Sequence, residues 1–190
     1  MVSFPGCSRR ELNELALNII KHYQPGILNG MEPFNLDGFI EVVEDFMKID
    51  FDFTSELPAG IDGCTSTIDN KVLIRAELVD DPSNERYARS TIAHEMGHVI
   101  LHMPLLRELS KDITFGQKKE EQGLNLYSRK VLKPYKDPEW QAWEFAGALL
   151  MPEPAIQAMI NKGMSPSQMA GIFNVNTVFM KLRMRNLKMI

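Results

Sequence analysis

Apolar positions recur at helical spacing in two segments near the start of the chain. The first, residues 8–23, opens with Ser8 and has Glu11 three residues later, a capping-box pattern. Its apolar stripe consists of Leu12, Leu15, Ile19 and Ile20. The second, residues 35–48, repeats the spacing with Leu36, Phe39, Ile40, Val43 and Met47. Both segments are predicted to be helices.

Between Phe51 and Leu78 the pattern changes to short apolar runs separated by turn signals. We expect strands around residues 64–68 and 71–76, joined by a turn at Asp69-Asn70. Two strands joined by so short a turn predict a small antiparallel sheet. The strand at 71–76 is also a candidate to bind an extended peptide as an added strand.

Two Asp-Pro pairs mark the next helix starts, because proline is favoured at the first helical position. The helix after Asp81-Pro82 is expected to run to about His102, and the helix after Asp137-Pro138 to end before Pro152. Residues 105–135 between them are polar and are predicted to form a long loop with at most one short helix.

The remaining residues show three helical patterns, at 155–161, 165–173 and 176–187. The chain as a whole is therefore expected to be an α+β protein, mostly helical and with a small antiparallel sheet. Its length of 190 residues suits one compact domain over residues 1–154 with a helical tail, 155–190, packed on it.

Composition and charge narrow the classes of function. The sequence is 44% hydrophobic and 24% charged, as in globular proteins, and its two cysteines, Cys7 and Cys64, form no disulfide framework. No signal peptide and no apolar run of about 20 residues is evident, which predicts a cytoplasmic protein without a membrane partner. The net charge of −4 argues against nucleic acid as a ligand.

The tail differs in charge from the rest, since no acidic residue follows Glu153 while five basic residues do. Its last two helical patterns could form a helix-turn-helix pair that contacts DNA. We favour the simpler interpretation, a helical hairpin packed on the body. In it the basic side chains Lys181, Arg183, Arg185 and Lys188 are solvated.

His94-Glu95-Met96-Gly97-His98 carries the candidate chemistry. Residues four apart lie on one helix face, so His94 and His98 can bind one metal ion. Glu95 can then lie beside the open coordination position and act as the base that takes a proton from zinc-bound water. Apolar neighbours predict that this helix is buried, and buried imidazoles need partners.

The third ligand must come from another segment. His102 lies eight residues beyond His94, about 12 Å along a continuous helix, too far to share the ion. Glu139 is the best candidate, because the first turn of a helix favours an ionised carboxylate. Glu144, five residues further on, is the competitor.

Two blocks of the sequence resemble those of the ImmA/IrrE-type metallopeptidases. The segment 89–102 resembles the block HExGHxxLH, and Glu139-Trp140-Gln141-Ala142-Trp143-Glu144-Phe145-Ala146 with Leu149-Leu150-Met151-Pro152 resembles ExxAxxFAxxLLMP. With the strand region before them, the resemblance covers about residues 50–155.

The resemblance implies a compact zincin-like domain that binds Zn²⁺. In that family the histidines corresponding to His94 and His98 are ligands, the glutamate at 95 is the base, and the glutamate at 139 is the third ligand. It also implies a protein substrate, a helix-turn-helix repressor that controls a phage, a mobile element or a stress response.

One position departs from the family pattern. The residue after Ala142 is commonly Asn or Asp, and here it is Trp143, whose indole can donate a hydrogen bond but not accept one. This departure motivates an alternative function, a metal-binding regulatory module that sequesters a transcription factor without cutting it. Tyr127 and Tyr135 are further candidates, as donors to a developing oxyanion.

Overall fold

The computed structural model describes residues 3–30, 32–109, 114–118 and 133–190. Each predicted helix is present, with ends that differ from the prediction by a few residues at most. Helix α1 begins where predicted because the Ser8 side chain accepts from the backbone of Glu11, whose own side chain caps Ser8 in return. The main helices are α1 (Arg9–Tyr23), α2 (Leu36–Met47), α4 (Glu85–Leu101), α6 (Pro138–Leu150), α7 (Glu153–Asn161), α8 (Pro166–Phe173) and α9 (Thr177–Asn186). Shorter ones are α3 (Ala76–Asp80) and α5 (Met103–Glu108), with single turns at Pro25–Asn29, Pro82–Asn84 and Pro134–Lys136.

The sheet contains the predicted antiparallel pair but is larger and mixed. Its strands are β1 (Asp50–Thr54), β2 (Ile61–Ser66), β3 (Lys71–Arg75) and β4 (Thr114–Lys118), in the order β1-β3-β2-β4. Strands β2 and β3 pair antiparallel as expected, whereas β1 pairs with β3 in parallel. The prediction of a purely antiparallel sheet is therefore wrong, because β1 pairs in parallel with β3, a strand to which no short turn joins it.

Strand β3 lies inside the sheet, between β1 and β2. Both of its hydrogen-bonding edges are occupied, so the segment 71–76 cannot take up a peptide as an added strand. In the described part of the chain the two edge strands are β1 and β4.

The segment predicted as a long loop with at most one short helix, 105–135, contains the end of a short helix and also a strand that was not predicted. Helix α5 follows α4 almost directly, and β4 pairs antiparallel with β2. The rest of that prediction, including Tyr127, lies outside the described residues.

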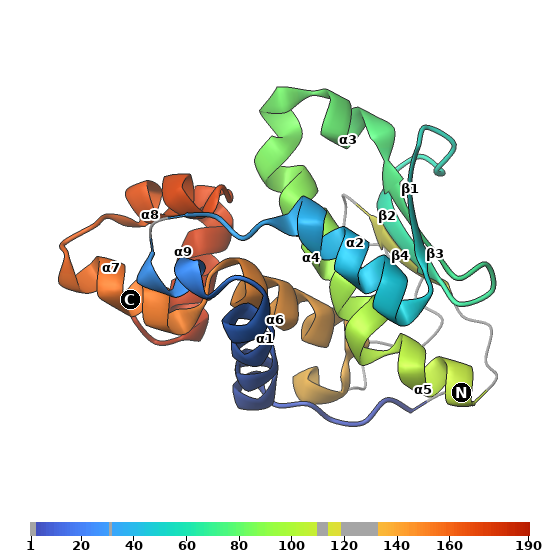
Figure 1. The fold of residues 1–190 in the computed structure, drawn as a ribbon, viewed down its shortest axis with the longest axis horizontal. Coiled ribbons are helices and arrows are strands. Elements are labelled where there is room, and N and C mark those ends of the chain that lie inside the picture. The colour runs from blue at the N-terminus through green and yellow to red at the C-terminus, as the bar shows by residue number, and fades with distance from the viewer. Residues whose placement is uncertain (1–2, 31, 110–113, 119–132) are drawn as a thin grey trace.

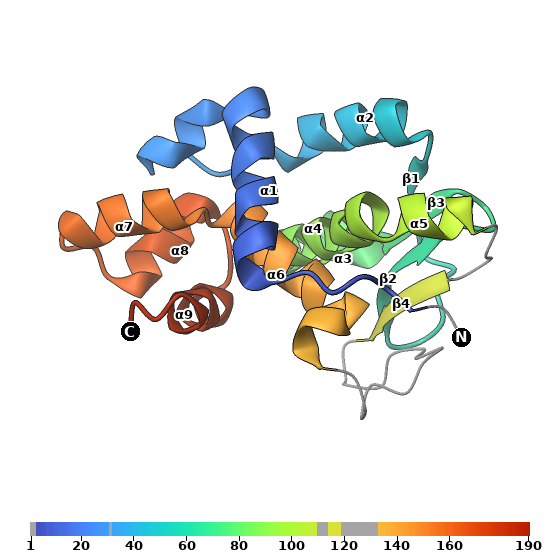
Figure 2. The same ribbon diagram turned by 90° about the horizontal axis from the view of Figure 1, so that it is seen from below.

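The sheet and the C-terminal helices lie at opposite ends of the molecule, with α1 and α6 between them (Figures 1 and 2). One apolar cluster extends through both parts, since it includes Val72 and Ile74 of β3 as well as Phe173 and Met180 of the tail. No helix in the described ranges is long and apolar enough to cross a membrane.

Candidate metal centre

Helices α4 and α6 approach each other closely at Gly97. A Cβ atom at this position would lie 2.9 Å from the Cα atom of Ala142, closer than real side chains pack. Glycine therefore lets the face of α4 that carries His94 and His98 lie against the first turn of α6, where Glu139 stands.

Three side chains converge there. The Nε2 atoms of His94 and His98 are 3.1 Å apart, and the Glu139 carboxylate lies 3.3 Å from His94 Nε2 and 3.5 Å from His98 Nε2. Tetrahedral zinc with ligands at about 2.0–2.1 Å holds its ligand atoms about 3.3 Å apart. The spacing and the N, N, O donor set therefore fit a zinc ion, and the three residues form a candidate metal-binding group.

Glu139 is placed by its own helix. The Asp137 side chain accepts a hydrogen bond from the Glu139 backbone N–H, and Pro138 occupies the first helical position. Burial alone would raise the pKa of the Glu139 carboxyl, but His98 and His94 hold that pKa well below its usual value. The carboxylate is thus ionised and suited to a cation.

A chain of hydrogen bonds behind the site fixes the tautomer of His98. The Gln141 amide nitrogen donates to the carbonyls of Pro5 and Tyr135, so its oxygen faces His102 Nε2, at 2.9 Å. Burial lowers the pKa of His102 to about 3, and the ring is neutral.

Because His102 donates from Nε2 to Gln141, its Nδ1 must be an acceptor. This Nδ1 lies 3.0 Å from Nδ1 of His98, which therefore carries the proton. The lone pair of His98 is left on Nε2, the atom that faces Glu139. His102 therefore supports a candidate ligand from behind and lies outside the candidate metal-binding group.

Glu95 is buried on the strand side of α4. Its Oε2 accepts a 2.6 Å hydrogen bond from the Thr65 hydroxyl of β2, while Oε1 has no partner among the described residues. Burial raises the pKa of Glu95 to about 7, against the lowering effects of His98 and Thr65. A Cβ at Gly63 would lie 2.8 Å from Oε1, so glycine lets the strand approach this carboxylate.

His94 is held differently from His98. Its ring packs against the Trp143 indole, with centroids 4.4 Å apart, and its Nδ1 is buried without a hydrogen-bond partner in the described part of the chain. Trp143 thus supports the His94 ring by a stacking contact and offers it no hydrogen-bond acceptor.

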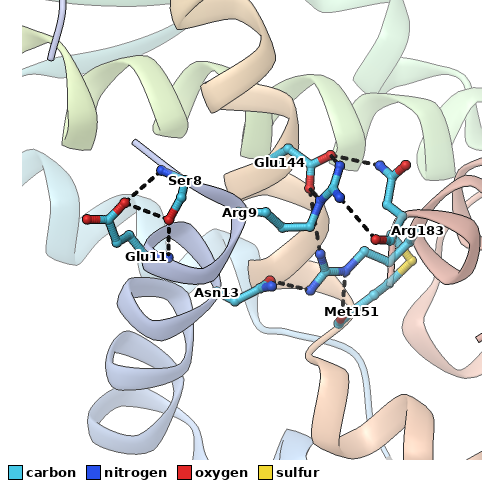
Figure 3. Close-up of polar contacts among 8 residues, drawn as sticks. Ser8, Arg9, Glu11, Asn13, Glu144, Met151 and Arg183 are labelled. Atoms are coloured by element: carbon cyan, nitrogen blue, oxygen red, sulfur yellow. Dashed lines mark hydrogen bonds and ion pairs between the residues drawn. The ribbon is translucent and has the colours of Figure 1, made fainter. Parts of the chain in front are cut away.

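Glu144 lies in an ion cluster with Arg9 and Arg183 (Figure 3). Its carboxylate accepts from Arg9 of α1 at 2.8 Å and 3.0 Å and lies 4.0 Å from the Arg183 guanidinium of α9. It therefore takes no part in the candidate metal group. Arg183 is buried, so its predicted solvation is wrong.

Thr65 and Gln141 were not anticipated from the sequence. Each contacts the site across 30 or more residues, and neither belongs to a motif with a recognised spacing. Tyr135 contributes its backbone carbonyl, and its side chain is 40% exposed.

Comparison with known proteins places the chain in a family. The family model of the IrrE N-terminal-like domain, Peptidase_M78, matches residues 78–185. A search of curated proteins gives no match.

Among solved structures, a Mycobacterium tuberculosis transcriptional regulator is similar in fold, with a TM-score of 0.58 and 15% sequence identity. The similarity covers 90% of this chain and 45% of that one, so this chain spans less than half of the regulator's length. With the family model covering more than half of the sequence, both helices of the candidate metal group included, the chain belongs to the IrrE N-terminal-like family of metallopeptidases.

Proposed function

We propose that this protein is a zinc-dependent endopeptidase with His94, His98 and Glu139 as ligands and Glu95 as the base. The observation that carries the proposal is the convergence of three ligand atoms at separations of 3.1–3.5 Å. A buried glutamate that follows the first histidine completes the arrangement.

In this function a zinc ion, when bound, supplies Lewis acidity to the scissile carbonyl and to water. Glu95 takes the proton from the attacking water and passes it to the leaving nitrogen. In the metal-free fold, burial raises the pKa of Glu95 above the ordinary value, and a raised pKa makes a carboxylate a stronger base. Thr65 holds the carboxylate in place from the sheet.

The proposed substrate is a helix-turn-helix repressor of a phage, a mobile element or a stress response. Family membership supports a protein substrate. The structural relative is described as a transcriptional regulator, which supports a role in gene regulation, although the likeness itself concerns the fold. A cytoplasmic location, where such a substrate resides, is part of the proposal.

The test is to incubate the purified protein with a helix-turn-helix repressor encoded beside its gene, with and without a chelator. Wild type should cut the repressor, and chelation should stop the reaction. Glu95→Gln should keep its metal and lose at least about 10²–10⁴-fold in rate. Near-normal turnover by that variant with zinc bound would refute Glu95 as the base.

The alternative function is a metal-binding module that sequesters a transcription factor without cutting it. The Trp143 substitution and the unpartnered Nδ1 of His94 favour it, because an unsupported ligand weakens a catalytic site. Under this alternative, Glu95→Gln would relieve repression as well as wild type does, and the repressor would stay intact.

A further inference from the structure

A cleft of about 850 Å³ lies between α6 and α9, beside the candidate metal group. Its size falls within the range of ligand-binding sites, about 300–1,000 Å³. Helix α6 contributes Trp140 and Trp143 to the walls, and α9 contributes Val178, Phe179 and Leu182. The cleft is thus lined mainly by large apolar side chains.

The cleft adjoins the metal group through Trp143. Trp143 lines the cleft and packs on the His94 ring, and its indole also contacts Phe179, with ring centroids 5.8 Å apart. Ser90, one helical turn before His94, lines the cleft as well. A chain whose peptide bond lay at the metal group would therefore place a neighbouring side chain in the cleft.

Its apolar walls are partly open to water. Val178 is 76% exposed and Leu182 is 46% exposed, whereas the charges at the floor are neutralised by the contacts of Glu144 with Arg9 and Arg183. Exposed apolar side chains around a concave surface are typical of binding sites.

Exposed basic residues flank the lining residues in the sequence. Lys181 and Arg185 lie on either side of Leu182 in α9, and Lys136 lies between Pro134 and Asp137. Asp137 is an acidic lining residue, and its carboxylate is engaged by the backbone N–H of Glu139. No acidic residue follows Glu153 in the sequence, so the α9 side offers no carboxylate. The cleft therefore complements a segment that is apolar at its centre and acidic at its flanks.

From these observations we infer that the α6–α9 cleft binds the part of the protein substrate next to the cut bond. That part carries a bulky apolar side chain with aspartate or glutamate beside it. The inference rests on the proposed function for the identity of the substrate, but binding in the cleft requires no catalysis.

Intrinsic fluorescence can report occupancy, because the only two tryptophans of the chain, Trp140 and Trp143, both line the cleft. The full chain carrying Glu95→Gln is titrated with a tryptophan-free peptide of about twelve residues, built from leucine, alanine, aspartate and glutamate. A second peptide has serine in place of every leucine. The leucine peptide should shift the tryptophan emission saturably, and the serine peptide should not.

Two matched substitutions locate the binding. Leu182 in the cleft and Val42 on α2 are 46% and 47% exposed, so a glutamate at either position costs little in folding. Leu182→Glu should weaken binding at least about tenfold, and Val42→Glu should leave it within about twofold.

The inference is overturned if no saturable shift occurs up to about 1 mM peptide, or if the two glutamate variants bind alike. It is also overturned if the emission changes with protein concentration alone, since a second copy would then fill the cleft. Failure of the proposed function would give a different result. The wild-type protein would still bind the leucine peptide, but it would leave the repressor uncut.

Discussion

The burial of Glu95 makes the free energy of unfolding depend on pH. Its pKa of about 7 in the metal-free fold exceeds the ordinary value of 4.5, so the native state retains a proton that the unfolded chain releases between these values. Stability is therefore lost as pH rises from about 4.5 to about 7, by about 3 kcal/mol in total.

Glu95→Gln, which carries no charge, should remove this dependence. With a chelator present, the variant and wild type should have similar free energies of unfolding in urea near pH 4.5, and the variant should be more stable at pH 8. If the difference between them were the same at both pH values, the raised pKa would be refuted.

Gln141 offers a second prediction for a single residue. Gln141→Met removes the acceptor that fixes the ring of His102 and, through it, the lone pair of His98. Zinc affinity, measured by competition with a chelator, should fall about 10–100-fold. The control is Gln157→Met on α7, whose side chain bonds only to Asn161 among the described contacts. Equal affinities in the two variants would disprove the hydrogen-bond chain.

The sequence was informative about these residues only where spacing carries geometry. His94 and His98 are four apart, and this alone places them on one helix face. The first-turn position singled out Glu139 over Glu144. Thr65 and Gln141 could not be found in this way, because their partners are brought to them by the packing of separate elements.

At the scale of elements, two glutamates of α6 are expected to have different roles, one in metal binding and the other in stability. Glu139 faces the metal group and Glu144 faces the two arginines. Glu139→Ala should abolish tight zinc binding, whereas Glu144→Ala should keep the zinc and lose about 3–5 kcal/mol of stability, because Arg183 is left buried without its carboxylate.

Metal content by mass spectrometry and unfolding in urea measure the two effects. Loss of zinc from Glu144→Ala, or tight zinc in Glu139→Ala, would reverse the assignment.

Elements with strong local signals were predicted well, and those fixed by distant partners were not. Helices α4 and α6 follow from an Asp-Pro start and an apolar pattern. Strand β1 is positioned by parallel pairing with β3, and no turn signal in the sequence indicates this pairing. Strand β4 pairs with β2, although α4 and α5 lie between them in the sequence.

At the scale of the molecule, we propose that the tail is part of the folding unit. Met169, Phe173 and Met180 are buried in the same apolar cluster as Phe145 of α6. A chain that ends at Pro154 should therefore show no cooperative thermal unfolding, while deletion of Ile190, which is 62% exposed, should change little. Cooperative unfolding of the shorter chain would make residues 1–154 an independent domain.

The contacts of Arg9 and Arg183 with Glu144 have a consequence for biosynthesis. These residues join the first and last long helices to α6 across 135 and 39 positions of the chain. Synthesis proceeds from the N-terminus at about 5–20 residues per second, so Arg9 is available to Glu144 as soon as α6 leaves the ribosome, whereas Arg183 follows only with α9. The ion cluster that joins both ends of the chain to α6 is therefore completed only at the end of translation.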